Sequence, residues 1–418
     1  MESLTLKNVR LEGKKTSIHI KENRIKQIGK PQAADTLIDC EGKAALPGFI
    51  NCHAHSAMSL MRGYADDLPL QTWLEKHIWP LEAKLTGEDI YWGTRLSCIE
   101  MLKSGTTCAS DMYWHPEKTY QAFRDSGIRA VVSSVFIDLF DDEKREKQIK
   151  ENQELMKKYG YENPRIKIAY GPHAPYTASR ESLEWIAEES KKQDALVHIH
   201  LSETDKEVKD CVKQNKLRPV QYLEELGLLS ENLSCAHGVW LSQSEKKILG
   251  EHKVNIAHCP TSNMKLAVGG VLDYEGLTSR GANVCLGTDG CASNNNQSML
   301  QSMKTASLIQ KHHTNNPTRL PAEKAFTMAT EKGAKALKID AGKIAEGKLA
   351  DIILVDLKNT KLLPTYNLKS NLVYSATDDC IDTVIVDGEI LVRDRHMEGE
   401  EEVYEQINQI KERITAEK

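Results

Sequence analysis

Short apolar runs separated by longer amphipathic stretches recur through the middle of this 418-residue chain, from about residue 49 to residue 340. The apolar runs have the length and composition of buried strands, and stretches such as RESLEWIAEESKKQ combine helical spacing with a charged face. The candidate strands are GFINCHAH, TTCASD, AVVSSVFID, IKIAYGPHAP, ALVHIHLSE, LSCAHG, VNIAHCP and NVCLGTDG. Eight strands with intervening helices predict an α/β fold, a (β/α)₈ TIM barrel over residues 49–340.

The two ends of the chain have a different pattern, in which short β-prone runs alternate with turn residues. Residues 1–48 contain LTLKNVRL, TSIHIKENRIKQIG and LIDCEGKAAL. The far end contains ADIILVDL and DTVIVDGEILV, with a hairpin signal at Asp387 and Gly388. Two β-rich ends that flank one barrel indicate a small domain built from both termini. We therefore expect an antiparallel, composite β-sandwich domain from residues 1–48 and 341–418.

Composition excludes several classes of partner. The formal net charge is −5 and the isoelectric point is near 6.3, so neither nucleic acid nor an anionic membrane surface is expected to bind. No run approaches the roughly 20 apolar residues of a membrane span, and MESLTLKNVRLEGKK lacks the apolar core of a signal peptide. The ten cysteines form no CxxC pair and indicate small buried residues of a reducing compartment. We expect a cytoplasmic protein.

Two histidines, His53 and His55, lie two positions apart at the end of the first candidate strand. Side chains alternate along a strand, so both imidazoles face the same way and can bind one metal ion. Polar residues also end later candidate strands: His173, His200 with Glu203, His237, His258 and Asp289. Catalytic groups of a TIM barrel come from the C-terminal ends of its strands, so these side chains are expected to share one site.

A catalytic zinc ion takes about three or four protein nitrogen and oxygen ligands and keeps a position for water. Four residues form such a set: His53, His55, His200 and Asp289. His198 competes with His200, because HIH is a second pair of histidines and the inward direction allows both. We choose His200, since Glu203 follows it and a metal-activated water needs a nearby proton carrier. His198 is then expected to pack in the barrel wall.

The motifs that carry these residues resemble the amidohydrolase superfamily. Within it they are similar to the branch that includes 5′-methylthioadenosine/S-adenosylhomocysteine deaminases and s-triazine chlorohydrolases. The motifs occur in the family order over nearly the whole chain: PGFINCHAHSAMSLMRG, WLEKHIWPLE, SGTT, GPHAPYT, HLSE, CAHG, HCPTSN and GTDG. A protease HExxH motif and the PCxxC ending of cytidine-type zinc deaminases are both missing.

The resemblance implies a role for each polar residue. The implied metal ligands are His53, His55, His200 and Asp289, and the implied catalytic residues are Glu203, His237 and Asp289. The implied substrate contacts are Glu82 to the ribose hydroxyls and His173 to the purine, with Glu203 and Asp289. Strand four ends in GPHAP, without the carboxylated lysine of binuclear relatives. One divalent metal ion is therefore expected, zinc before iron, manganese or nickel.

The resemblance also implies a reaction, the hydrolytic deamination of a cyclic amidine C–N bond with release of ammonia. The implied substrates are adenosine-type nucleosides and thioethers: 5′-methylthioadenosine, S-adenosylhomocysteine and adenosine. The alternatives are a deaminase of another aminated heterocycle, of the guanine, 8-oxoguanine, pterin or cytosine type, and a chlorohydrolase. Glu203 favours deamination, which requires ring protonation. A non-catalytic scaffold is disfavoured because all four ligand-type residues are present.

Two further expectations concern partners and specificity. Relatives are commonly dimers or tetramers, so a homo-oligomer that binds a small heterocyclic molecule is expected. Members that act on adenosyl thioethers usually carry an arginine at the end of the third strand, where AVVSSVFID offers Ser133 and Ser134. Without a bidentate partner, the amino-acid carboxylate of S-adenosylhomocysteine would bind less well. This departure disfavours that substrate relative to 5′-methylthioadenosine.

Overall fold

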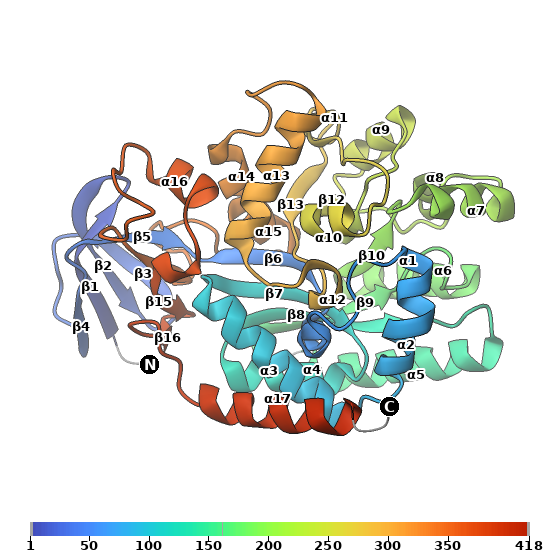
Figure 1. The fold of residues 1–418 in the computed structure, drawn as a ribbon, viewed down its shortest axis with the longest axis horizontal. Coiled ribbons are helices and arrows are strands. Elements are labelled where there is room, and N and C mark those ends of the chain that lie inside the picture. Colours follow the sequence, from blue (N-terminus) through green and yellow to red (C-terminus); the bar gives the residue numbers. More distant parts are fainter. Residues whose placement is uncertain (1–2, 161, 416–418) are drawn as a thin grey trace.

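The eight strands predicted between residues 49 and 340 all form, and they lie parallel in one barrel (Figure 1). The computed structural model describes residues 3–160 and 162–415. The barrel strands are β6 (Phe49–Ala54), β7 (Thr106–Tyr113), β8 (Arg129–Phe136), β9 (Ile166–Pro172), β10 (Val197–Leu201), β11 (Leu233–His237), β12 (Asn255–His258) and β13 (Asn283–Leu286). The N–H groups of Thr288 and Asp289 donate to the His53 carbonyl, which joins the end of the last strand to the first.

Helices follow the strands and cover the outside of the barrel (Figure 1). The longer ones are α3 (Gly87–Lys103), α4 (Pro116–Ser126), α5 (Asp142–Tyr159), α6 (Arg180–Gln193), α7 (Asp205–Asn215), α9 (Gln243–Glu251) and α13 (Met299–His313). The shorter ones are η1 (Ser56–Met61), α1 (Leu70–Trp73), η2 (Leu74–Ile78), α2 (Trp79–Glu82), α8 (Pro219–Glu225), α10 (Pro260–Lys265), α11 (Tyr274–Thr278), α12 (Cys291–Asn294), α14 (Ala322–Met328), α15 (Glu331–Ala336), α16 (Leu368–Tyr374) and η3 (Asp378–Cys380).

Helix α6 illustrates why the amphipathic stretches fold as predicted, because it spans the whole of RESLEWIAEESKKQ. The Ser179 side chain caps its N-terminus by accepting a hydrogen bond from a backbone N–H of the first turn. Leu183 and Ile186 lie on one face, three positions apart, and both are fully buried against the barrel. The helix ends at Gln193 and is followed by the capping residue Asp194, which adopts a left-handed conformation with φ 48°.

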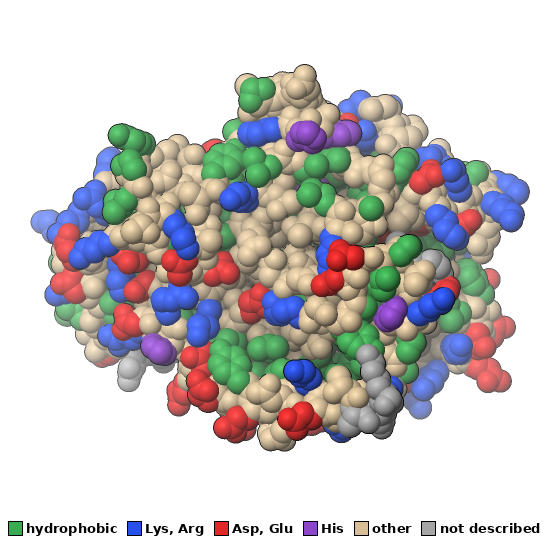
Figure 2. Space-filling view, in the orientation of Figure 1, with side chains coloured by type: hydrophobic (Ala, Val, Ile, Leu, Met, Phe, Trp, Pro, Cys, Tyr) green, Lys and Arg blue, Asp and Glu red, His purple; other side chains and the backbone are tan. Residues whose placement is uncertain are grey.

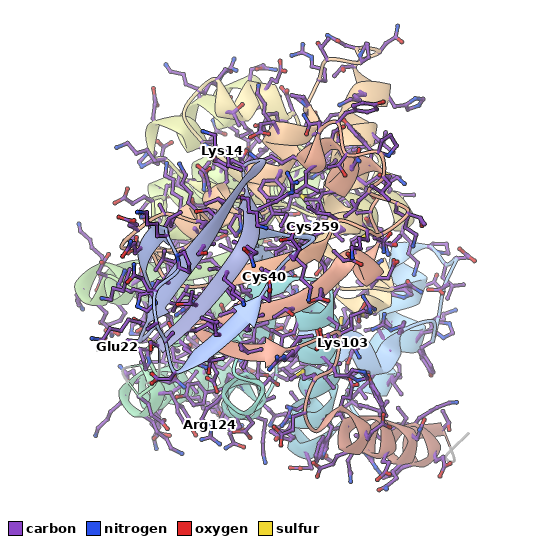
Figure 3. The ribbon with its side chains drawn as sticks, turned by 90° about the vertical axis from the view of Figure 1, so that its left-hand side faces the viewer. Lys14, Glu22, Cys40, Lys103, Arg124 and Cys259 are labelled. Atoms are coloured by element: carbon purple, nitrogen blue, oxygen red, sulfur yellow. The ribbon has the colours of Figure 1, made fainter. Side chains whose placement is uncertain are left out.

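Both ends of the chain contribute to the small domain, as predicted. Its strands form one sheet: β1 (Ser3–Leu11), β2 (Lys14–Lys21), β3 (Arg24–Gly29), β4 (Thr36–Asp39), β5 (Lys43–Pro47), β14 (Ile352–Asp356), β15 (Ile381–Val386) and β16 (Glu389–Val392). Pairing of β14 with β5 joins the two ends, and β15 turns into β16 at Asp387 and Gly388, as predicted. The sheet is mixed rather than purely antiparallel, because β1 pairs in parallel with β4 and β5. Figure 3 looks onto it, with Lys14 at the start of β2 and Glu22 just past its end.

The last helix, α17 (Glu400–Thr415), packs along α3 of the barrel rather than on the small sheet (Figure 1). Lys103, labelled in Figure 3, ends α3 and pairs with Glu400 at 2.6 Å. Arg413, near the other end of α17, pairs with Asp89 at 2.5 Å. The division into residues 1–48 with 341–418 and residues 49–340 remains a proposal, in which this helix of the C-terminal segment lies against the barrel.

A buried network of ion pairs joins the barrel to the small domain. Arg129, the first residue of β8, donates to both carboxylate oxygens of Asp351, at 2.9 and 3.1 Å, and to Asp387 at 2.7 Å. Arg165 donates to the other oxygen of Asp387 at 3.0 Å. Buried charges need such partners, so the network ties the small domain to the N-terminal end of the barrel strands.

The surface and the cysteines agree with the sequence. On the face shown in Figure 2, acidic and basic side chains are interspersed over the molecule. All ten cysteines are buried and unpaired. Among the described residues, no helix is both long enough and apolar enough to cross a membrane.

Candidate metal centre

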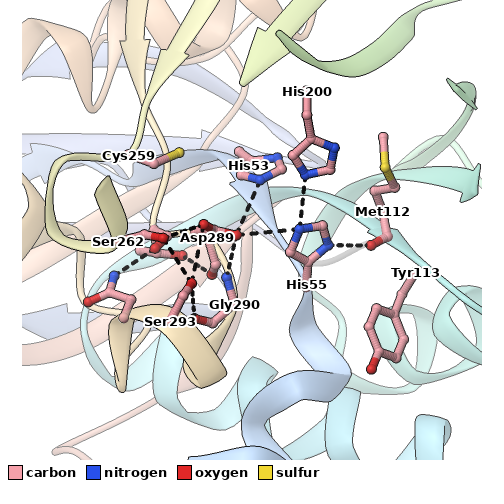
Figure 4. Close-up of polar contacts among 12 residues, drawn as sticks. His53, His55, Met112, Tyr113, His200, Cys259, Ser262, Asp289, Gly290 and Ser293 are labelled. Carbon is pink, nitrogen blue, oxygen red and sulfur yellow. Dashed lines mark hydrogen bonds and ion pairs between the residues drawn. The ribbon is translucent and has the colours of Figure 1, made fainter. Parts of the chain in front are cut away.

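Polar residues predicted from the strand ends gather at the C-terminal end of the barrel, and Figure 4 shows four of them: His53, His55, His200 and Asp289. The Nε2 atoms of His53 and His55 each lie 3.4 Å from Oδ1 of Asp289. His55 Nε2 also lies 3.2 Å from His200 Nε2. Donor atoms of His53, His200 and His237 lie within 4.8 Å of one another. The chain therefore brings nitrogen and oxygen donors from strands one, five, six and eight to one point.

The ring nitrogens that face one another at this point carry lone pairs. His55 Nδ1 lies 2.6 Å from the Met112 carbonyl oxygen, and His200 Nδ1 lies 2.7 Å from the His173 carbonyl oxygen. A carbonyl only accepts, so both Nδ1 atoms donate, and in the neutral form of each ring the Nε2 atom is unprotonated and carries a lone pair. His53 Nε2 is buried without a hydrogen-bond partner among the described residues. A cation would satisfy all of these electron-rich atoms, so the residues fit the predicted metal.

Burial sets the charge state of the cluster. It lowers the pKa of His53 to about 4 and of His173 to about 3, and it lowers the pKa of His200 as well. These rings are therefore neutral near pH 7, the form that binds a metal. Burial alone would raise the pKa of Asp289, but its interactions with His53 and the other rings outweigh burial and hold that pKa well below its usual range. Neutral imidazoles with one carboxylate suit zinc.

Two further side chains lie within hydrogen-bonding distance of the candidate ligands His53 and Asp289. His198 lies beside His53, with its Nε2 atom 2.8 Å from His53 Nδ1 and its Nδ1 atom 3.3 Å from Ser110 Oγ. Ser262 donates to Oδ2 of Asp289 at 2.6 Å. The sequence predicted only packing for His198. The contact of His198 with His53 could have been predicted, because the sequence allows the His198 side chain to point into the barrel. Nothing in the sequence predicted the contact of Ser262 with Asp289.

Glu203 and His237 face each other beside the ligands. Glu203 Oε2 lies 3.9 Å from His237 Nε2, and His237 Nδ1 lies 2.8 Å from Oδ1 of Asn263. Burial raises the pKa of Glu203. Burial would lower the pKa of His237, but the carboxylates of Glu203 and Asp289 outweigh it and raise that pKa. His258, at the end of β12, is buried with neither ring nitrogen hydrogen-bonded within the described part of the chain.

The two predicted substrate contacts adjoin this cluster. Glu82, at the end of α2, accepts a hydrogen bond from the Tyr113 hydroxyl at 2.6 Å, and burial raises the pKa of its carboxyl group. The ring centroid of Tyr113 lies 6.3 Å from that of His55. The ring centroid of His173 lies 4.7 Å from that of His200. Both residues therefore lie within reach of a molecule bound at the candidate ligands.

A cavity of about 420 Å³ opens beside Glu82. Its lining consists of Trp79, Glu82, Ala83, Leu85, Ile90, Tyr113, Trp114 and His115. Among these residues there is no lysine or arginine, and Glu82 is the one carboxylate. The wall is therefore mainly apolar, and it includes two tryptophans to which the sequence assigned no role.

The placement of Ser133 and Ser134 corrects one expectation. They do not end the third strand, because β8 continues to Phe136, and both serines are buried within it. The residues that follow the strand, 137–141, include no arginine or lysine. The lack of a basic residue therefore holds for the observed strand end, although the serines do not occupy it.

Similarity to known proteins places this site in a family. The model of the amidohydrolase family matches residues 44–391. The chain belongs to the amidohydrolase family. A 5′-deoxyadenosine deaminase of Methanoregula boonei is 50% identical to it over 371 residues, which cover 88% of this chain and 84% of the relative. A 5-methylthioadenosine/S-adenosylhomocysteine deaminase of Archaeoglobus fulgidus is 47% identical over 412 residues, which cover 98% and 95%.

Solved structures share the fold of this amidohydrolase. An adenosine deaminase from Xanthomonas campestris with bound zinc has a TM-score of 0.93 at 32% identity, over 99% of this chain and 98% of that chain. An atrazine chlorohydrolase from Arthrobacter aurescens, complexed with zinc, has a TM-score of 0.90 at 22% identity, over 98% and 100%. The second likeness concerns the fold alone.

Proposed function

We propose that this amidohydrolase is a metal-dependent hydrolytic deaminase of adenine nucleosides. The convergence of electron-rich donor atoms beside the pair Glu203 and His237 carries the proposal, because it combines a metal site with a proton carrier. The relatives at 50% and 47% identity are named as deaminases of 5′-deoxyadenosine and of 5-methylthioadenosine/S-adenosylhomocysteine, which supports this class of substrate.

We assign one metal ion to four ligands: His53, His55, His200 and Asp289. Their mutual distances and the lone pairs of the rings support this set, and the zinc of the Xanthomonas campestris relative supports zinc. Iron, manganese and nickel are the alternatives. When bound, a divalent metal supplies the Lewis acidity that makes water a nucleophile near neutral pH.

Residues of the chain then move the protons of the reaction. Asp289 accepts a proton from the attacking water, and His237, held by Asn263, orients that water. Glu203, whose pKa is raised by burial, gives a proton to the ring nitrogen next to the attacked carbon. The second water proton returns to Glu203, and Asp289 passes its proton to the amino group. The C–N bond breaks, ammonia leaves, and the water oxygen remains on the ring as the carbonyl.

The cavity beside Glu82 supports a narrower substrate class. We assign the ribose hydroxyls to Glu82, so the 5′ group of the nucleoside would meet the wall beyond it. That wall, which includes Trp79 and Leu85, contains no lysine or arginine. A small uncharged 5′ group suits it, whereas the amino-acid carboxylate of S-adenosylhomocysteine would lose its hydration without gaining a partner. We therefore favour 5′-deoxyadenosine and 5′-methylthioadenosine.

The proposed function is tested by ammonia release from a panel of heterocycles. The zinc-loaded protein is incubated with 5′-deoxyadenosine, 5′-methylthioadenosine, S-adenosylhomocysteine, adenosine, guanine, cytosine and atrazine. We expect ammonia from the nucleosides, with the inosine-type product seen by its ultraviolet spectrum. Metal-loaded Glu203→Gln is the control and should release ammonia only at a small residual rate. Turnover of only a free base or the halogenated triazine would overturn the proposal.

Selectivity at the 5′ position has a matched pair of variants. Ala83 lines the cavity and is exposed, so a longer side chain there does not disturb the core. Ala83→Arg would supply the missing cation and should raise kcat/KM for S-adenosylhomocysteine about 10-fold relative to 5′-methylthioadenosine. Ala83→Gln, which adds length without charge, should leave the ratio unchanged. An equal effect of both variants would show that charge at this wall does not select the substrate.

We further propose that the enzyme works as a homo-oligomer in the cytoplasm. Ten buried, unpaired cysteines support a reducing compartment. Light scattering of the purified protein measures the oligomer directly, and a monomeric mass at micromolar concentration would contradict this part of the proposal.

A further inference from the structure

We propose that Glu207, on the first turn of α7, is a positioning residue that aims Glu203 for proton transfer. The inference rests on the proposed function, because Glu203 is the proton carrier of that reaction. It adds a residue for which the sequence motifs suggested no role.

The Glu203 carboxylate lacks a fixed partner. Within residues 3–160 and 162–415, no hydrogen bond reaches it, and its 3.9 Å separation from His237 Nε2 is longer than a hydrogen bond. Glu203 lies two residues beyond the end of β10, in the turn that leads into α7. The direction of its side chain therefore depends on the backbone of this turn.

That backbone is held in an unfavourable conformation. Ser202 has φ 51°, in the left-handed region that residues with a side chain rarely adopt. Its carbonyl accepts hydrogen bonds from the N–H groups of Val239, at 3.1 Å, and Trp240, at 2.8 Å. Such conformations persist where the surrounding structure imposes them, and they gather at functional sites.

Glu207 secures the other side of the same turn. One of its carboxylate oxygens accepts the Ser202 N–H at 2.7 Å, and the other accepts the Glu203 N–H at 2.7 Å. The N–H groups of Ser202 and Glu203 therefore both donate to one carboxylate. Glu207 is only 6% exposed, and among the described residues no lysine or arginine pairs with it. A buried carboxylate without a cation is expensive for a fold, so this arrangement needs a reason beyond packing.

Ordinary helix capping does not supply that reason. In a capping box, the third residue of a helix bonds back to the N–H of the capping residue. Glu245 does this in α9, where it accepts the N–H of Ser242 at 2.8 Å and pairs with Arg218 at 2.7 Å. Glu207 occupies the same helical position in α7, but its carboxylate reaches past the capping residue, Thr204, to the two residues before it.

The comparison of these two glutamates provides the test. Glu207→Gln places an amide NH₂ group against a backbone N–H and frees the turn. Because small displacements of a catalytic group reduce rates strongly, we expect kcat of the zinc-loaded enzyme to fall about 30- to 100-fold. KM and the zinc content should stay within twofold of the wild type. Glu245→Gln is the matched control, which should lower Tm and leave kcat within twofold.

A double-mutant cycle shows whether Glu207 acts through Glu203. In a Glu203→Ala background, which removes the proton carrier, adding Glu207→Gln should change the residual kcat by less than twofold. A repeat of the full loss in that background would overturn the proposal. So would a Glu207→Gln enzyme that loses only Tm, as Glu245→Gln is expected to do.

Two further results separate the possible failures. Glu207→Asp keeps the charge but is too short to span both N–H groups, so it should fold if Glu207→Gln does not, with kcat reduced about 10-fold and zinc retained. Wild-type kcat in Glu207→Asp would overturn the positioning role. Absence of any deamination by the wild-type enzyme would instead overturn the proposed function, while active wild type with fully active Glu207 variants would overturn only this inference.

Discussion

The two ends of the barrel interior are built from the same strands and carry opposite chemistry. At the N-terminal end, inward side chains such as Cys52, Cys108 and Leu196 form an apolar layer that is closed by α15. At the C-terminal end the inward side chains are imidazoles and carboxylates. Along β10 and the residue before it, the change takes place over five residues, from Leu196 through His198 to His200. Side-chain identity at inward positions, rather than backbone shape, therefore decides which end reacts.

The same burial has different consequences at the two ends. It raises the pKa of Cys108 to about 12, so that thiol stays protonated and inert. It lowers the pKa of His53 to about 4, which leaves a neutral ring with a lone pair available to a metal. The N-terminal end, which α15 covers and which we call the closed end, stabilises the fold through packing. The C-terminal end, which we call the open end, has buried polar atoms without hydrogen-bond partners among the described residues. Unsatisfied buried groups of this kind indicate function.

The largest expected effect comes from removing a proposed metal ligand at the open end. His200→Ala removes one of the four proposed ligands, so zinc content and activity should be lost together, with kcat/KM reduced about 10⁴-fold. Elemental analysis and ammonia release measure the two quantities on the same sample. A variant that retains zinc and activity would show that His200 is not a ligand and would point to His198.

A substitution at the closed end should have the opposite effect, a loss of stability without a loss of activity. Arg129→Met leaves Asp351 and Asp387 buried without their guanidinium partner, so the free energy of unfolding should fall by about 3–5 kcal/mol. Activity per folded molecule should not change, because the network lies at the N-terminal end of the strands. Urea unfolding and kcat are measured on the same preparation. A fall in kcat without a fall in stability would contradict the proposed difference between the two ends of the barrel.

A weaker effect is expected from the residue between the two ends. His198→Phe removes the hydrogen bond to His53 Nδ1 while filling the space in the wall. Loss of such a supporting contact typically weakens metal affinity about 10- to 100-fold. Competition with a zinc chelator measures this affinity. Unchanged affinity would mean that His198 only packs, as the sequence alone suggested.

The smallest expected effect is a pH dependence at the closed end. Burial would raise the pKa of Asp387, but Arg129 and Arg165 outweigh it and hold the folded-state pKa below 3.8. The stabilisation from this carboxylate is therefore present above pH 3.8 and is lost as the pH falls through the folded-state pKa. Between pH 5 and pH 3, Tm should fall less steeply in Asp387→Asn than in the wild type. Parallel curves would contradict this assignment.

Local patterns were enough to predict the barrel and the residues gathered at its open end. Strand periodicity located all eight strands, and the convergence of parallel strand ends brought His53, His200 and Asp289 together. Contacts between distant segments carried no local signal. The bond of Asn263 to His237 and the reach of Glu207 past its helix cap depend on loop conformation, which no spacing rule describes.

Two features of the terminal segments of the chain could also not be predicted from the sequence. The parallel pairing of β1 with β4 and β5 depends on which edge each strand meets, and β-prone runs do not encode that choice. The position of α17 along α3 involves contacts between residues far apart in the chain, such as the ion pair of Lys103 with Glu400 and the packing of Ile410 and Ile414.

The contrast between a nitrogen-rich open end and a sulfur-containing closed end has one direct measurement. X-ray absorption at the zinc edge of the metal-loaded protein reports which atoms surround the ion. We expect one zinc per chain with nitrogen and oxygen neighbours at about 2.0–2.2 Å and no sulfur. Sulfur neighbours at about 2.3 Å, or a second metal nearby, would contradict it.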